Sequence, residues 1–366
     1  MSETVPSDYT DPSSLLHQLE FILESDPLID EVGFVHPSQF AAMTDISDTS
    51  QANTIDTTFW SKDHKLGIST QILHPLYKAA KHAFMSSRDQ YLHSKKLELS
   101  SSLTTLETEL MNHSRALLLL SCDFGTVWNC RKEVVLKKQD MKLYLNELSL
   151  SSLVLSYSPK SEPAWSHRRW VIKKIAGKCT NLEDILKNES ALAKTIAEKS
   201  KMNYRAWNHR CWLVTYMPET QVIEELIKYR DWAGLHVADN SCFHYRTRLM
   251  SRTLEDSWHN KDLKICQLWK EEIAWNEMLI KRYIGRESLW LYRRFLSVSW
   301  IRHFAVIPDE VFEDYQSQAM FAATYIMWLI KQMDDHEGVR SIGKEVEEVV
   351  KKVCPEKAFL LDLVRV

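Results

Sequence analysis

The sequence predicts an all-α protein built as a solenoid of about five degenerate helical hairpins. Glycine and proline are scarce, with 8 and 10 among 366 residues, and long stretches carry apolar residues at helical spacing with scarcely any alternating strand pattern. From about residue 103 onward, the chain also repeats an aromatic residue that is followed three positions later by an arginine. Self-similarity with a period near 40 residues is typical of solenoids in which each repeat is a pair of antiparallel helices.

The region before the repeats is expected to contain a tail, a short helix, a loop and a longer helical stretch. Residues 1–14 have the composition of a disordered tail, and the apolar pattern then predicts a helix over 14–24. The sequence IDEVGF leads into a polar stretch that is expected to be a loop, and the pattern does not fix the conformation of residues 43–58. Helical periodicity returns near Leu66 and predicts one or two amphipathic helices. With helical extensions at both ends, residues 15–366 are expected to form a single helical-repeat domain.

The repeats between about residues 103 and 300 are defined by the aromatic and arginine positions. Successive aromatic residues lie about 36 to 47 positions apart, as in helical-hairpin arrays. The five pairs are Trp128 with Arg131, Trp165 with Arg168, Trp207 with Arg210, Phe243 with Arg246, and Trp290 with Arg293. In three units, a residue suited to cap a helix N-terminus stands four positions before the aromatic, namely Ser161, Asn203 and Asp239.

A tryptophan and an arginine three positions apart share one face of a helix, which predicts a structural joint. The tryptophan is expected to pack inside its hairpin, while the arginine reaches a carboxylate or a helix C-terminus in the neighbouring repeat. The histidines that precede two of the arginines are interpreted as interface groups, because the spacing supplies neither an orienting partner nor a nucleophile for a general base. The groups expected to contact the next hairpin or a partner are His167, Arg168, His209, Arg210, His244, Arg246 and Arg293.

Composition and motif content argue against several classes of protein. The net charge of −3 offers no basic excess for nucleic acid, and the seven cysteines contain no CxxC pair, so the expectation is reduced thiols and no metal site of the chain's own. No GxGxxG or GxSxG motif occurs, and a near match to a P-loop at residues 338–344 is followed by Glu345 where a serine or threonine is required. Because neither a secretion signal nor a long apolar span is found, the chain is expected to be cytoplasmic and not to insert into a membrane.

The runs SPKSEPAWSHRRW and MNYRAWNHRCW resemble the repeat of protein prenyltransferase alpha subunits, whose hallmark is a helical hairpin with a Trp-x-x-Arg core. The resemblance implies a right-handed crescent superhelix that wraps around a separate beta subunit. Further stretches, DPLIDEVGF and FAATYIMWL among them, resemble one branch of the family, so that the likeness covers roughly residues 24–330. This branch implies the beta subunit of Rab geranylgeranyltransferase as partner and C-terminal cysteines as acceptors, including that of an already farnesylated SNARE. Zinc would be held by the beta subunit, geranylgeranyl diphosphate would be the co-substrate, and this chain would bind no cofactor and be inactive alone.

The resemblance assigns roles to few residues of this chain. Lys160, five positions before Trp165, matches the lysine that the family extends towards the diphosphate, where it would stabilise the charge that grows on the leaving group. Tyr204, three positions before the next repeat tryptophan, and the adjacent Asn203 match positions near the substrate. Glu162 departs from the family, because it stands where farnesyltransferase-like alpha subunits carry a tyrosine. The expected function is therefore the alpha subunit of a heterodimeric protein geranylgeranyltransferase. The alternative is a non-enzymatic solenoid adaptor that binds a protein partner.

Overall fold

The computed structural model describes residues 11–43, 58–97, 100–200, 202–255, 263–304 and Tyr325. The chain divides into two compact units, which are considered separately. The first comprises residues 1–182 and 191–209, and the second comprises residues 183–190 and 210–366. The predicted tail up to residue 10, the loop over 44–57 and the C-terminal extension beyond residue 304, apart from Tyr325, lie outside the described residues.

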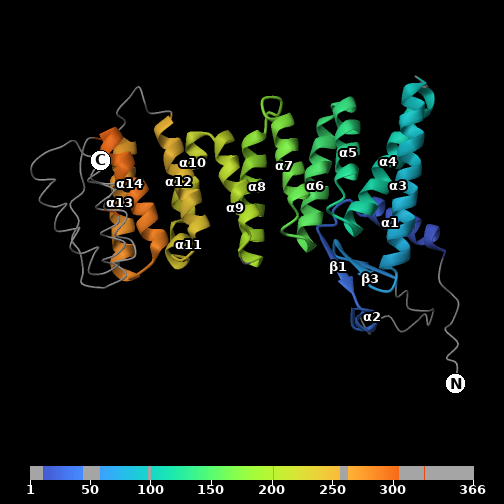
Figure 1. Ribbon diagram of the computed structural model, residues 1–366, viewed down its shortest axis with the longest axis horizontal. Helices are drawn as coiled ribbons and strands as arrows, with labels where there is room; N and C mark the ends of the chain where they lie inside the picture. The colour runs from blue at the N-terminus through green and yellow to red at the C-terminus, as the bar shows by residue number, and fades with distance from the viewer. Residues whose placement is uncertain are drawn as a thin grey trace, which may run out of the picture. The chain divides into compact units, whose positions relative to one another are not determined.

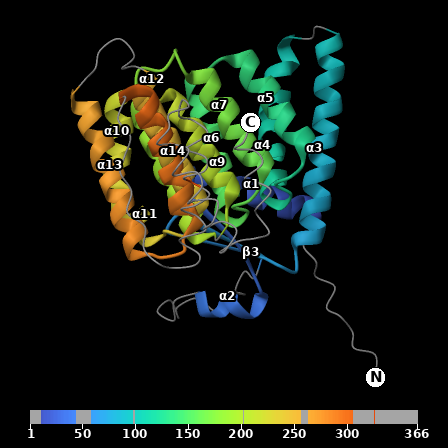
Figure 2. The ribbon, with the colours of Figure 1, turned by 60° about the vertical axis from the view of Figure 1, so that its left-hand side comes forward.

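The first unit begins with a helix and a small sheet. Helix α1 (Pro12–Ser25) agrees with the predicted helix, starting two residues earlier. Strands β1 (Glu31–Val35), β2 (Phe59–Lys62) and β3 (Lys65–Ser69) form a sheet in the order β1-β3-β2, in which β1 is parallel and β2 antiparallel to β3. Helix α2 (Pro37–Met43) follows β1, and Figures 1 and 2 show α2 and the sheet beyond one end of the helices of this unit.

The sheet corrects the prediction that IDEVGF enters a loop and that helical structure returns near Leu66. Residues 31–34 belong to β1, and Leu66 lies in β3. Strands of four or five residues are too short to show a period, and four consecutive residues of β3 are buried, so no alternation marks the strand. Asp63 and His64, which join β2 to β3, both have positive φ angles of 50° and 61°, as a tight two-residue hairpin turn requires.

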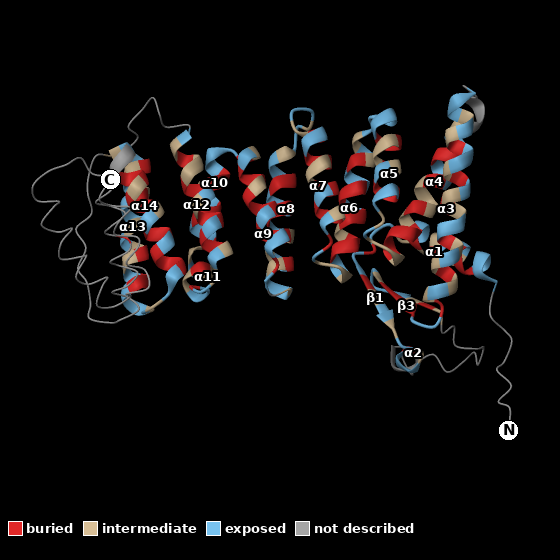
Figure 3. Ribbon diagram, in the orientation of Figure 1, coloured by how far each residue is buried: buried red, intermediate tan, exposed pale blue. Residues whose placement is uncertain are grey.

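The predicted amphipathic helices before the repeats form one helix, α3 (Leu73–Lys96). Its buried residues recur at intervals of three or four, from Leu76 and Ala80 to Phe84, Ser87 and Tyr91, which places them on one face. Figure 3 shows that buried positions gather on the sides of the helices that face their neighbours, while α3 keeps an exposed outer side.

The repeat region consists of five helical hairpins, as the sequence predicts (Figure 1). The hairpins are α4 (Ser100–Leu120) with α5 (Gly125–Lys138), α6 (Met141–Tyr157) with α7 (Glu162–Ile175), α8 (Leu182–Lys199) with α9 (Tyr204–Leu213), α10 (Glu219–Lys228) and α11 (Arg230–Leu235) with α12 (Asn240–Glu255), and α13 (Leu263–Arg282) with α14 (Glu287–Phe304). A 3₁₀ turn, η1 (Val214–Tyr216), extends α9. The helical-repeat fold is thereby confirmed, with the small sheet as an addition to it.

The three predicted N-cap residues occupy the predicted positions. Ser161 Oγ accepts a hydrogen bond from the backbone N–H of Ala164 at 3.5 Å, and Asn203 Oδ1 accepts one from the N–H of Ala206 at 3.1 Å. Asp239 Oδ1 accepts from two backbone N–H groups at the start of α12. Each aromatic-arginine helix in these units thus begins where its cap satisfies the first unpaired donors.

Candidate functional site

Each repeat arginine lies at a joint between helices, and Arg131 in the first unit shows the arrangement most fully. Its Nε and Nη2 donate to the two carboxylate oxygens of Glu147 in α6, at 3.0 and 2.6 Å. Its Nη1 donates to the carbonyl of Met111 and the hydroxyl of Ser114 in α4, both at 2.7 Å. One planar guanidinium therefore connects three helices, which is a geometry that lysine cannot reproduce.

His167 completes this joint from the next hairpin. Its Nε2 lies 2.8 Å from Glu147 Oε2, and its ring packs 4.6 Å from the ring of Trp128, centroid to centroid. Burial lowers the pKa of His167, although Glu147 opposes the effect, so we take the histidine as neutral with its Nε2 proton donated to the carboxylate. Burial alone would raise the pKa of Glu147, but the charge of Arg131 and the bonds from His167 and Arg131 lower it to about 2. The result is a fixed carboxylate, and not a group poised to accept a proton near neutral pH.

The second unit contains two joints of the same design, with tyrosine in place of histidine. Arg210 Nη2 donates to Glu225 at 2.9 Å, and Tyr245 Oη donates to the same carboxylate at 2.7 Å. Arg246 binds Glu272 through two bonds of 2.8 Å, and Tyr292 Oη donates to that carboxylate at 2.8 Å. In each of these joints, one carboxylate accepts bonds from two residues. One is the arginine of a repeat, and the other is the residue directly before the arginine of the next repeat.

A second contact of the arginines recurs at a constant distance along the chain. Each arginine donates to a residue 20 positions earlier in the first helix of its own hairpin. The acceptors are the carbonyls of Met111, Leu148, Leu226 and Ile273 and the hydroxyl of Ser190. The predicted carboxylate partner is thus confirmed at three joints. The second acceptors lie within helices, except that Leu226 lies in the last turn of α10.

Most of the seven side chains that were expected to contact the next hairpin or a partner are buried in the joints between helices. The six that are at most 2% exposed are His167, Arg168, His209, Arg210, Arg246 and Arg293. Arg168 donates to the carbonyl of Leu148 and to two serine hydroxyls, and the His209 ring packs 4.9 Å from that of Trp165. Only His244 among the seven is exposed, so a contact with a partner is left as a prediction for His244, while the buried six join helices of this chain.

The carboxylates Glu147, Glu225 and Glu272 were missed by sequence reasoning. Each is buried in the first helix of a hairpin. Glu147 is the lone acidic residue of its helix, whereas Glu225 and Glu272 each follow another glutamate, so no common sequence pattern marks the three. A signal for Tyr245 and Tyr292 does exist, because both occupy the position before a repeat arginine that His167 and His209 occupy elsewhere. That shared position could have identified the tyrosines as members of the same joint.

Lys160, Asn203 and Tyr204 come together in the first unit at two neighbouring turns, which we call the turn ridge, residues 158–162 and 202–205. Asn203 Nδ2 donates to the carbonyl of Pro159 at 2.8 Å, and Trp165 Nε1 donates to the same carbonyl at 3.0 Å. Asn203 is buried, and its bond to Pro159 holds one turn to the other. Lys160 is exposed, and Tyr204 is 70% exposed. Lys160 and Tyr204 are thus exposed at neighbouring turns, and Asn203 links the two turns.

The described residues contain neither a candidate metal site nor a candidate membrane span. Within the described residues, no group of three or more histidine, cysteine, aspartate or glutamate side chains is placed to hold a metal ion. No helix among these residues has the length and apolar character needed to cross a bilayer.

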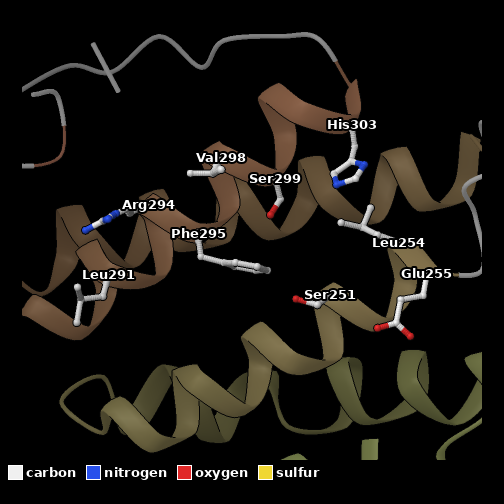
Figure 4. Close-up of a pocket in the computed structure, with 9 residues that line it drawn as sticks. All are labelled: Ser251, Leu254, Glu255, Leu291, Arg294, Phe295, Val298, Ser299 and His303. Atoms are coloured by element: carbon white, nitrogen blue, oxygen red, sulfur yellow. The ribbon is translucent and has the colours of Figure 1, made fainter. Parts of the chain in front are cut away.

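The second unit contains a cavity of about 670 Å³ between α12 and α14. Figure 4 shows the Phe295 side chain directed into this cavity, with Arg294 towards one end and His303 towards the other. None of the residues predicted for chemistry lines the cavity, so it is distinct from the turn ridge.

Comparison with known proteins now identifies the repeat. A model of the protein prenyltransferase alpha subunit repeat matches residues 144–175, 186–217 and 269–299. The chain contains protein prenyltransferase alpha subunit repeats. The three matches fall on the hairpins α6 with α7, α8 with α9, and α13 with α14. The two remaining hairpins share the arginine contact across 20 positions with the matched ones.

Curated relatives agree with the prenyltransferase repeat. The chain is 30% identical over 259 residues to protein prenyltransferase alpha subunit repeat-containing protein 1 of Danio rerio, covering 57% of this chain and 59% of that protein. It is 29% identical over 234 residues to the Homo sapiens protein of the same name, covering 51% and 58%. A shorter match, 28% identical over 107 residues, is to geranylgeranyl transferase type-2 subunit alpha of Mus musculus, covering 27% of this chain and 17% of that protein. The chain spans somewhat more than half the length of the repeat-containing proteins it matches.

Proposed function

We propose that this chain is the alpha subunit of a heterodimeric protein geranylgeranyltransferase. A beta subunit, that of Rab geranylgeranyltransferase, would hold the zinc ion and transfer a geranylgeranyl group from geranylgeranyl diphosphate to C-terminal cysteines of selected proteins, including an already farnesylated SNARE. The observation that carries the proposal is the turn ridge, in which Asn203 ties the turn of Lys160 to the turn of Tyr204 within prenyltransferase repeats. The similarity to a geranylgeranyl transferase alpha subunit supports the same type of reaction.

In this proposal, the chain contributes positive charge and a scaffold to chemistry that takes place on its partner. Zinc would lower the pKa of the substrate cysteine and so supply the thiolate nucleophile. Lys160 would stabilise the negative charge that develops on the diphosphate as the carbon–oxygen bond breaks, because a positioned cation binds the transition state more tightly than the ground state. Tyr204, with Asn203 behind it, would line the groove that receives the protein substrate. We expect the function to be carried out in the cytoplasm.

The proposal is tested by co-expressing the chain with the Rab geranylgeranyltransferase beta subunit. We expect a stable heterodimer that transfers labelled geranylgeranyl groups to peptides ending in cysteine and that loses activity when zinc is chelated. A stable complex without transfer to any such peptide or protein would instead favour the alternative, a non-enzymatic adaptor. Failure to form a complex would contradict the subunit assignment itself.

Replacing Lys160 with alanine separates its predicted role from assembly. The Lys160→Ala heterodimer should form normally, since the side chain is exposed, but its single-turnover rate should fall by at least about tenfold. Lys174→Ala is a matched control, because Lys174 is also an exposed lysine of the same hairpin and lies in the last turn of α7. A normal single-turnover rate in Lys160→Ala would remove the lysine from the mechanism.

A further inference from the structure

The turn ridge contains an ion-pair network centred on Glu162. This glutamate is the first residue of α7 and lies two residues after Lys160. Its Oε1 is 2.6 Å from Arg169 Nη2, and its Oε2 is 3.0 Å from Arg205 Nε. Arg205 directly follows Tyr204 in the first turn of α9, so the carboxylate connects the two turns of the ridge.

Each carboxylate oxygen of Glu162 is bound by a different arginine, and these two contacts decide which cations of the ridge are paired. Glu162 is the carboxylate nearest in sequence to Lys160, and an acidic side chain two residues away in a turn could pair with the lysine. Lys160 nevertheless forms no ion pair within the described part of the chain. The other carboxylate beside this turn, Asp123, accepts a hydrogen bond from Ser161 Oγ at 3.0 Å.

The two arginines differ in how firmly they can hold Glu162. The side chain of Arg169 is 19% exposed and belongs to the same helix as Glu162, whereas that of Arg205 is 43% exposed and belongs to the neighbouring repeat. Arg205 is therefore the partner whose loss releases one carboxylate oxygen without disturbing the buried part of α7. The four charged groups together carry a net charge of +2, and Lys160 is the cation among them that forms no ion pair with the carboxylate.

We propose that Arg205 is a positioning residue that holds Glu162 away from Lys160 and so preserves the charge of that lysine for an anionic ligand. The inference rests on the proposed function in naming that ligand as the diphosphate of a prenyl donor. In the absence of Arg205, the released Oε2 of Glu162 pairs with Lys160 and offsets its charge, while Arg169 keeps Oε1. Glu162, which stands where farnesyltransferase-like alpha subunits carry a tyrosine, is thus compatible with a cationic site because two arginines bind its carboxylate.

If Arg205 acts by holding Glu162 away from Lys160, removing the Glu162 carboxylate as well should restore the transfer rate. A purely structural role for the Glu162–Arg205 ion pair predicts no such recovery. In the heterodimer, Arg205→Gln should slow single-turnover transfer about fivefold, the factor that an exposed ion pair of up to about 1 kcal/mol can produce. The double variant Glu162→Gln with Arg205→Gln should instead transfer at the rate of Glu162→Gln alone, because no carboxylate is left there to pair with Lys160. If the double variant is as slow as Arg205→Gln, the pair acts as a clamp and the proposal is overturned.

A second measurement does not depend on transfer activity. The reactivity of the Lys160 amine towards acetic anhydride, measured against that of Lys174 in the same sample, reports whether a carboxylate pairs with the lysine. Arg205→Gln should lower the relative reactivity of Lys160 severalfold, because pairing stabilises the unreactive ammonium form, and the double variant should restore it. Unchanged reactivity in Arg205→Gln would overturn the proposal even in an active enzyme. The predicted labelling pattern without any transfer would overturn only the prenyltransferase assignment.

Discussion

Replacing Glu147 with glutamine is expected to lower the free energy of unfolding of the first unit by about 3 kcal/mol at pH 7. Glu147 is 0% exposed and receives two bonds from Arg131 and one from His167. The drop in its pKa from 4.5 to about 2 corresponds to about 3 kcal/mol, at about 1.4 kcal/mol per pH unit. Breaking a buried ion pair by removing one partner costs about 3 to 5 kcal/mol, because the remaining charge, here that of Arg131, is left uncompensated.

The pH dependence of this contribution has a definite sign. The pKa of Glu147 is lower in the folded chain than in the unfolded one, so the stabilisation is complete above about pH 4.5 and is lost as the pH falls towards 2. The difference in unfolding free energy between the unchanged protein and Glu147→Gln should therefore be constant from pH 5 to 7 and should shrink below pH 4.5.

Urea unfolding, followed by circular dichroism at several pH values, measures both quantities. Glu198→Gln serves as the control, since Glu198 lies in the same unit and forms an exposed pair with Lys194 at 3.5 Å. That variant should lose no more than about 0.5 kcal/mol. A loss below 1 kcal/mol for Glu147→Gln, or a difference that does not shrink at low pH, would refute the description of the joint as a buried, charge-assisted contact.

Two further predictions concern the hairpin of α6 and α7 and its contact with the next turn. Trp165→Ala should destabilise the first unit by about 3 to 5 kcal/mol, because the indole is fully buried and its removal leaves a cavity; thermal unfolding that resembles that of the unchanged protein would contradict this packing. Asn203→Ala should cost about 1 to 2 kcal/mol through loss of the cap of α9 and of the bond to Pro159. Asn203→Asp should recover the part due to the cap, since it keeps the oxygen acceptor but cannot donate to Pro159. Equal losses in the two Asn203 variants, measured by urea unfolding, would show that the cap contributes nothing.

The order of the helices in the repeat region could be predicted because it depends on local pattern. Apolar spacing marks the helices, and Ser161, Asn203 and Asp239 mark where three of them begin, since a cap acts on backbone groups only two or three residues away. The sheet could not be predicted in the same way. Strands β1 and β3 are separated by a long intervening segment, and their pairing depends on contacts that no local window contains.

The candidate site, like the fold, was predictable from the sequence only in part. The sequence by itself determined that each repeat carries an aromatic residue and an arginine on one helix face, and it placed Lys160 and Tyr204 before two of the tryptophans. The acceptors that those arginines bind are known only from the tertiary structure, because a guanidinium bonds to whichever carboxylates and carbonyls lie within reach in the folded chain. It also decided that Glu162 faces two arginines from different helices. The spacing along one helix follows from 3.6 residues per turn. Contacts between hairpins depend instead on how the faces of the helices pack, and no fixed interval in a single sequence encodes that packing.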